Sequence, residues 1–335
     1  MRWMTLGAAL VGAMLAQGAW AKGPQEALDQ VILPAFAGFK DAAQVLETES
    51  QNDCTAPALA APYNAAFDAW IAVEPYAAGP IEDSGFGRAI AFWPDSRGAT
   101  PTTIRRLIAE ADPVVADVGS FRSVSIAARG LFGLEMMLFD PEFSAYTPDS
   151  YACDLTRAMA ADLADMVAQL STAWHDDFAP LMRTAGAHGN SRFLSQAEVA
   201  QFLLTAATGA LEFDEAARLA RPLGSFERPR PNRAEARRAG RALRNVDLSV
   251  GHVKTLTQAL VNEEEMPITM AAFARAQAAA DALKDDPVFA GVATPDGRLK
   301  VEILQQRIHE LRERLSGEVG GILGVTAGFN ALDGD

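Results

Sequence analysis

The spacing of apolar residues is the feature that most constrains the fold of this chain. Apolar side chains recur at helical intervals along most of the sequence, and alanine is frequent throughout. Runs of alternating β-branched and polar residues are nearly absent, and proline and glycine punctuate the helical stretches. The sequence therefore predicts an all-α protein.

Several helix starts can be located from capping residues. Ser195–Glu198 and Asn232–Glu235 have the spacing of a capping box, and Thr100 precedes a proline that suits the first turn of a helix. We expect helices near 26–49 (bent at Pro34), 58–73, 102–111, 125–139, 151–174, 196–220, 233–261, 269–283 and 300–315.

The distribution of these helices predicts two domains. The polar, glycine-containing segment 183–192 divides the chain near its middle, with four or five helices on either side. We expect two helical bundles packed together, an N-terminal bundle at 22–185 and a C-terminal bundle at 186–335. The segment 75–100 is rich in glycine, proline and aromatic residues, and so long a connection inside a compact domain is usually functional or structurally specific.

The first 21 residues predict a signal peptide. Arg2 precedes the apolar run Leu6–Ala16, and Ala19–Ala21 has the small-x-small pattern of a cleavage site. The run is shorter than the roughly 20 residues that a spanning helix needs, although an N-terminal membrane anchor is the alternative. We expect cleavage after Ala21, export to the periplasm or cell envelope, and no transmembrane segment in the mature chain.

Charge and cysteine content narrow the partners and the compartment. The net charge of −14 argues against nucleic acid and anionic membrane surfaces as partners. The two cysteines, Cys54 and Cys153, could form a disulfide in an oxidising compartment, where closing a loop of about 100 residues contributes on the order of 4 to 5 kcal/mol. Two free buried thiols are the alternative.

Histidine is too sparse for a familiar metal site. The chain has four histidines and no Glu-x-x-His pair of the di-iron type. His309-Glu310 opens like the zinc-protease motif, but Glu313 stands where the second histidine must be. A solvated helix face explains this stretch better.

Three blocks cluster aromatic, glycine and charged residues that a generic bundle helix does not need: 79–97, 129–140 and 323–335. Together with Trp70 and the turn Arg221–Gly224, they occur in the order in which the imelysin family has them, and the chain resembles that family over nearly all of its mature length. The resemblance implies two helical bundle domains, export, and a link to iron-regulated uptake. Some members are classed as metallopeptidases on the basis of a Gly-x-His-x-x-Glu motif.

This sequence departs from the family motif at its histidine. The motif falls on Gly130–Glu135, and Phe132 occupies the histidine position. Phenylalanine can neither ligate a metal nor move a proton, so a metallopeptidase and a histidine-dependent metal site are both disfavoured. A second departure lies in 239–243, where the family leads us to expect serine beside Gly-Arg.

The remaining motif residues predict a binding site at the domain interface. Glu135 lies one turn beyond Phe132 on an otherwise apolar helix, so its carboxylate needs a partner or a shifted pKa, and Arg97 or Arg129 is the expected partner. Glu135 is the best single candidate for a metal ligand, and no catalytic residue is predicted. The predicted site consists of Gly130, Phe132, Glu135, Arg129, Trp93, Asp95, Arg97, Asp333 and Asp335.

Each part of this site also has a structural alternative. Glu135 could belong to a buried ion pair that fixes domain packing. Residues 93–95 could provide aromatic packing and an aspartate helix cap. Asp333 and Asp335 could form a polar tail.

Three functions are consistent with the sequence. The leading hypothesis is an exported, non-catalytic protein associated with iron or another divalent metal, with envelope or iron-uptake proteins as partners. The alternatives are a metallopeptidase of the imelysin type and a scaffold for envelope redox proteins.

Overall fold

The computed structural model describes residues 22–328. The predicted signal peptide, and Asp333 and Asp335 of the terminal block, lie outside these residues. Within 22–328 the regular structure is helical, with no strand beyond an isolated bridge between Ser225 and Arg228. The all-α prediction is confirmed.

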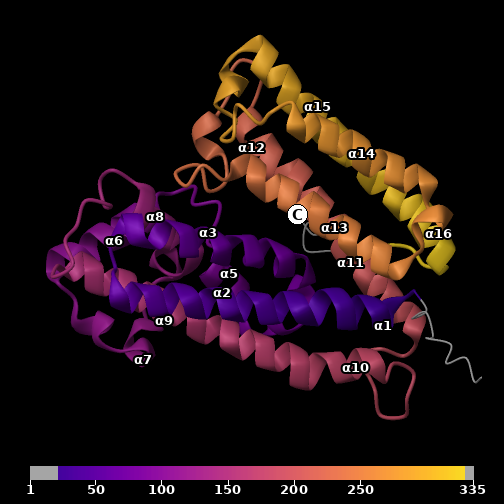
Figure 1. Ribbon diagram of the computed structural model, residues 1–335, viewed down its shortest axis with the longest axis horizontal. Coiled ribbons are helices and arrows are strands. Elements are labelled where there is room, and N and C mark those ends of the chain that lie inside the picture. Colours follow the sequence, from indigo (N-terminus) through magenta and orange to yellow (C-terminus); the bar gives the residue numbers. More distant parts are fainter. Residues whose placement is uncertain (1–21, 329–335) are drawn as a thin grey trace, which may run out of the picture.

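Ten α-helices form the first group, coloured indigo to rose in Figure 1. They are α1 Pro24–Ala27, α2 Leu33–Asn52, α3 Ala56–Val73, α4 Glu82–Ser84, α5 Phe86–Ile90, α6 Ala99–Glu110, α7 Val118–Phe121, α8 Gly130–Phe139, α9 Tyr151–Thr172 and α10 Ala179–Arg183. The long helix α2 packs against both α3 and α9. The structure bonds Cys54, after α2, to Cys153, in the first turn of α9.

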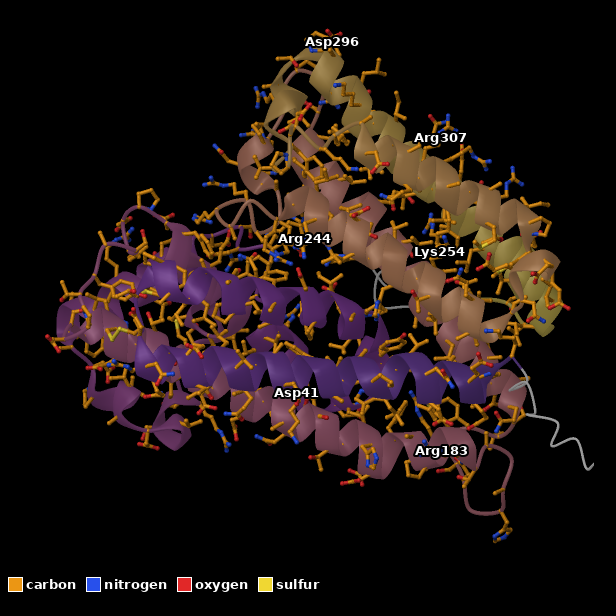
Figure 2. All side chains as sticks on the ribbon, in the orientation of Figure 1. Asp41, Arg183, Arg244, Lys254, Asp296 and Arg307 are labelled. Atoms are coloured by element: carbon orange, nitrogen blue, oxygen red, sulfur yellow. A yellow bond between two sulfur atoms is a disulfide. The ribbon has the colours of Figure 1, made fainter. Side chains whose placement is uncertain are left out.

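The second group contains the C-terminal helices, coloured orange to yellow in Figure 1. They are α11 Gln196–Phe213, α12 Ala220–Leu223, α13 Ala242–Leu260, α14 Pro267–Asp281, α15 Pro295–Arg314 and α16 Gly320–Leu323. Helix α13 packs against α3, and α1 contacts both α11 and α13. Arg244, which is labelled on α13 in Figure 2, is also ion-paired with Asp68 on α3. Charged as well as apolar contacts therefore cross the boundary.

The burial pattern follows from the sequence periodicity. Helix α9 buries Leu155, Met159, Leu163 and Leu170 on one face, as an amphipathic helix does. Helix α8 is different, because residues 130–138 are buried all round. The buried apolar residues form one continuous core through both groups, and α8 carries Glu135 into it.

The predicted helix 233–261 is wrong at its start, since α13 begins at Ala242. Ala236 and Gly240 have positive φ angles of 43° and 70°, which helical residues do not adopt. Glu235 is not part of a capping box: its carboxylate accepts hydrogen bonds from Arg218 and Asn245. Residues 231–241 are therefore an interface loop.

Two further expectations need smaller corrections. The predicted helix 125–139 begins at Gly130, because Ser125 caps a separate 3₁₀ turn at Ile126–Ala128. The predicted helix 196–220 ends as α-helix at Phe213 and continues through a π-helical turn, Asp214–Leu219. In the part of the chain that the structure describes, no helix has the length and apolar character needed to cross a bilayer.

Candidate functional site

Glu135 is buried at the boundary between the two groups of helices. Its side chain is 4% exposed, and Oε1 accepts hydrogen bonds from the backbone N–H of Arg238 at 2.8 Å and of Ala239 at 3.4 Å. Nη1 of Arg238 lies 4.0 Å from Oε2. Burial raises the pKa of Glu135, and the charge of Arg238 with these two N–H groups offsets only part of that rise.

The charged partner of Glu135 is therefore Arg238, and the expectation of Arg97 or Arg129 is wrong. Arg238 is anchored by Asp140, whose Oδ2 accepts from Nε at 2.6 Å. Arg129 instead makes a bidentate ion pair with Asp162, with both hydrogen bonds at 2.8 Å. Arg97 is exposed and takes no part in the wall around Glu135.

Gly130 has a structural role at the start of α8. Its φ is +61°, and a Cβ there would lie 2.2 Å from the carbonyl oxygen of Ala89 and 2.3 Å from that of Ile90. A side chain would be excluded by both the backbone conformation and the close approach of α5. The glycine of the motif therefore positions α8 and needs no ligand role.

Phe132 fills the histidine position of the motif with aromatic packing. It is 6% exposed and stacks on Trp93, with ring centroids 6.4 Å apart and an interplanar angle of 15°. On its other side it meets the Phe67 ring edge to face at 5.6 Å. Trp93 and Phe132, which are far apart in sequence, thus form one aromatic wall beside Glu135.

Asp95 caps helix α6. Its carboxylate oxygens accept from the backbone N–H groups of Ala99 at 2.9 Å and Thr100 at 2.8 Å. Burial opposes ionisation, but these N–H groups outweigh it and hold the pKa of Asp95 below its usual value. Asp95 therefore acts as a helix cap, which was the structural alternative for this residue.

These elements surround a pocket of about 310 Å³ that both groups of helices line. The volume is at the lower end of the range typical of small-molecule sites. The first group contributes the loop after α5, the start of α6 and one side of α8, and the second contributes Arg221 and the interface loop. The lining residues are Phe92, Trp93, Pro94, Asp95, Ser96, Gly98, Thr100, Pro101, Phe132, Glu135, Met136, Arg221, Asn232, Arg233, Ala234, Ala236, Arg237 and Arg238.

The arginines of this pocket were not predicted from the sequence. Arg221 lies over the Trp93 ring, 5.5 Å from its centroid, and its buried Nε has no hydrogen-bond partner in the described part of the chain. Burial and the neighbouring charge of Arg233 lower the pKa of Arg221. The available signal was compositional, since residues 228–244 contain seven arginines in an acidic chain.

The residues around Glu135 do not fit a divalent metal ion. The other carboxylate of the pocket, Asp95, uses both oxygens to cap α6, and Glu135 lies among backbone N–H groups and arginines. Between residues 22 and 328 there is no group of three or more His, Cys, Asp or Glu side chains placed to hold a metal ion. One carboxylate among cations is a poor donor set for iron or zinc.

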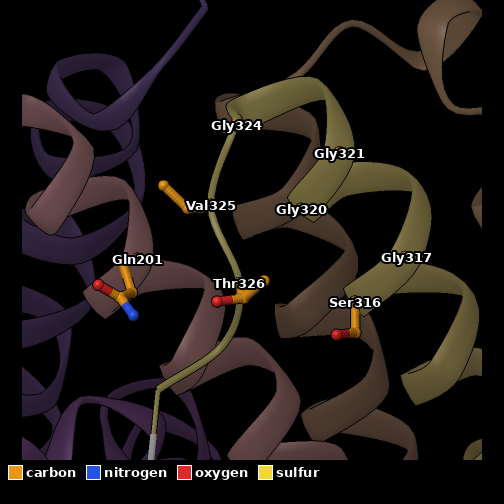
Figure 3. Close-up of a pocket in the computed structure, with 8 residues that line it drawn as sticks. All are labelled: Gln201, Ser316, Gly317, Gly320, Gly321, Gly324, Val325 and Thr326. Carbon is orange, nitrogen blue, oxygen red and sulfur yellow. The ribbon is translucent and has the colours of Figure 1, made fainter.

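A second hollow, of about 740 Å³, lies between α11 and the C-terminal end of the second group (Figure 3). Figure 3 shows the segment with Val325 and Thr326 between Gln201 on α11 and the turn that carries Ser316, and four glycines form much of the wall. The described residues that line it carry no charged side chain. The pocket beside Glu135 is therefore the better candidate for a specific site.

A comparison with protein-family models identifies the family. The model described as Imelysin (peptidase M75) matches residues 32–315, which is most of the chain. This chain belongs to the imelysin family. The family resemblance inferred from the sequence is confirmed, and the histidine position of its motif is occupied by Phe132.

Solved structures share the fold of this imelysin-family protein at low sequence identity. An imelysin-like protein from Psychrobacter arcticum 273-4 superimposes with a TM-score of 0.74 at 17% identity, covering 91% of this chain and 97% of that one. A "putative iron-regulated protein A precursor" from Parabacteroides distasonis ATCC 8503 superimposes with a TM-score of 0.71 at 15% identity, covering 91% and 96%. No curated protein matches the sequence.

Proposed function

We propose that this imelysin-family protein is exported to the periplasm or cell envelope and binds a small ligand there without catalysing a reaction. The observation that carries the proposal is the pocket at Glu135, whose walls come from both groups of helices. We propose that these groups are two domains, divided at residue 185, with the ligand between them. Ligand sites commonly lie at such interfaces.

The geometry favours binding over hydrolysis. A metallopeptidase needs a metal-activated water or a free general base. Here Phe132 occupies the motif histidine position, and the Glu135 carboxylate accepts two backbone N–H groups beside Arg238. The alternative of a scaffold for envelope redox proteins does not account for a pocket with an aromatic wall and a buried carboxylate.

Export and the iron link rest on separate support. The pattern of residues 1–21 is that of a signal peptide, and the disulfide between Cys54 and Cys153 suits an oxidising compartment. The iron link comes from the family and from the name of the Parabacteroides protein. We propose that this chain serves an iron-linked system together with envelope or uptake proteins.

Native mass spectrometry of the protein purified from the periplasm tests the binding function. Asn232→Trp places a large ring at the pocket wall, and Asn262→Trp adds the same ring at an exposed site outside the pocket. We expect a small molecule to be retained by the wild type and by N262W, and lost from N232W. Equal masses for all three proteins, with no adduct, would contradict the proposal.

A protease assay on the same samples addresses the enzymatic alternative. We expect no cleavage of unfolded casein, with or without chelator. Chelator-sensitive cleavage by the wild type would favour the metallopeptidase.

A further inference from the structure

The charge of the interdomain pocket identifies the kind of ligand that it can hold. Four arginines line it, Arg221, Arg233, Arg237 and Arg238, against two carboxylates, Glu135 and Asp95. Four positive and two negative side chains line the pocket, and Asp140 behind the wall pairs with Arg238, so one positive charge remains in excess in a chain whose net charge is −14. The wall of the pocket is therefore positively charged, although the protein as a whole is negatively charged.

Three of these arginines form no ion pair, although the charge of Arg237 acts on Glu135 and Asp140 from a greater distance. Arg238 is paired with Asp140. Within residues 22–328 the guanidinium groups of Arg221, Arg233 and Arg237 form no ion pair or hydrogen bond, and Arg221 lies over the face of Trp93. The buried Nε of Arg221 is an unsatisfied donor.

By contrast, the buried arginines of the described part of the chain have carboxylate partners. Arg129, which is 7% exposed, has a bidentate partner in Asp162, and the fully buried Arg218 is surrounded by three carboxylates. A guanidinium that is removed from water without a counter-charge is unfavourable. A ligand that supplies the missing acceptors would relieve this for the partly buried Arg221, and the exposed Arg233 lines the same pocket.

The wall also excludes other ligand classes. Unpaired guanidinium groups repel a cation, and a neutral ligand would accept hydrogen bonds from Arg221 but leave its charge without a counter-charge. The indole of Trp93 and the side chains of Phe132 and Met136 add apolar surface beside the charges. Charged donors next to an aromatic wall suit an organic molecule that carries an oxyanion.

We infer that the interdomain pocket binds a small organic oxyanion, whose carboxylate or phosphate group accepts hydrogen bonds from Arg221, Arg233 and Arg237. This inference rests on the proposed function and names the ligand class of the same pocket. It also specifies how iron would be bound, because an anionic chelate of iron suits this wall whereas a bare iron ion does not.

Isothermal titration calorimetry of the mature protein tests the inference. The probes are citrate as the carboxylate, glucose 6-phosphate as the phosphate ester, glucose as the neutral control and choline as the cation. The variants are Arg221→Gln, Arg233→Gln and Arg237→Gln. Arg228→Gln is the matched control, because Arg228 is an exposed arginine outside the pocket.

We expect at least one oxyanion to bind, glucose and choline not to bind, and each pocket variant to weaken binding by about tenfold. R228Q should stay within about twofold of the wild type. Binding of citrate alone identifies a carboxylate ligand, and binding of glucose 6-phosphate alone identifies a phosphate ester. Circular dichroism melts of each variant separate lost binding from lost folding.

The inference is overturned if neither oxyanion binds the wild type, or if the three pocket variants bind as R228Q does. It fails alone, and the proposed function survives, if native mass spectrometry finds a neutral or cationic ligand that N232W removes and the arginine variants retain. Both fail if N232W changes no bound mass and no probe binds.

Discussion

Two sets of arginines lie at the boundary between the groups of helices. One set is ion-paired with carboxylates, and the other set is not. Arg218 is 1% exposed and donates to Glu235 at 2.6 Å, to Asp214 at 2.8 Å and to Glu74 at 2.5 Å. Arg241 is equally buried and donates to Asn64 and Asp68. Since Glu74, Asn64 and Asp68 come from the first group, these arginines hold the two groups together.

The pocket arginines lack such partners although they lie on the same interface. The charges of Arg221 and Arg233 lie close to each other, and the two carboxylates of the pocket wall, Glu135 and Asp95, accept hydrogen bonds from backbone N–H groups. Stable packing explains the paired set. For the unpaired set, we propose that a bound ligand supplies the missing hydrogen-bond acceptors. The predictions below test this contrast between the two sets.

The largest expected effect is the loss of the paired set. Arg218→Met leaves Glu74, Asp214 and Glu235 around an apolar side chain, so we expect the free energy of unfolding to fall by about 3–5 kcal/mol. The control Arg244→Met removes an exposed arginine paired with Asp68 and should change it by about 1 kcal/mol or less. Urea unfolding measures both, and equal losses would contradict the distinction.

The paired set also predicts a pH dependence. Burial raises the pKa of Asp214 to about 7, against the opposing effect of Arg218. An unfolded aspartate titrates near 3.9, so between about pH 4 and 7 the folded state binds more protons at this site. The contribution of Asp214 to stability therefore decreases as the pH rises through this window and levels off above about 7.

Asp214→Asn tests the sign of this dependence, because asparagine resembles the protonated form. We expect the variant to gain stability relative to the wild type as the pH rises from about 4 to 7, in urea unfolding at several pH values. A relative loss of stability over the same pH range would show that ionisation of Asp214 in the folded state costs little free energy.

Removing the unpaired set should have little effect on folding. Arg221→Gln takes away a charge that faces Arg233 and has no carboxylate partner, so we expect the free energy of unfolding to change by less than about 0.5 kcal/mol, or to rise. Thermal melts without ligand give the answer. A loss comparable to that of R218M would mean that Arg221 is a structural residue.

The substitution Phe132→His tests whether the histidine of the family motif restores a metal site. The Arg237 and Arg238 charges would remain beside Glu135, and Asp95 would still cap α6. We expect no stoichiometric iron or zinc in elemental analysis of this variant. A metal retained by F132H and absent from the wild type would show that the histidine alone determines metal binding.

Arg97→Gln should have the smallest effect. Arg97 is exposed and lies outside the pocket wall, so anion affinity should stay within about twofold of the wild type. A larger loss in the same calorimetric titration would extend the binding surface beyond the described pocket.

The sequence predicted the fold better than it predicted the site. Apolar spacing is a local signal, so it located helices such as α2, α3 and α9. It also placed Trp93, Phe132 and Glu135 in one site, because the family motif and the loop after α5 carry recognisable residues. All three line the pocket.

The other half of the pocket had no local signal. Arg238 meets Glu135 across 103 positions of sequence, and helical periodicity cannot report such a contact. The apparent capping box at Asn232 led to the wrong prediction of a helix in the interface loop. The Glu235 side chain does not cap a helix, because it accepts a hydrogen bond from Arg218. Long-range ion pairs, rather than propensity, determine the conformation of this segment.

The measurement that tests the account most directly compares wild type with Glu135→Gln in parallel titrations with citrate and with ferrous ion. Glutamine keeps an oxygen to accept the Arg238 N–H but removes a negative charge from the pocket wall. An anion-binding pocket predicts that E135Q binds citrate at least as tightly as the wild type and that neither protein binds iron stoichiometrically. Stoichiometric iron in the wild type that is lost in E135Q, with no citrate binding to either, would contradict it.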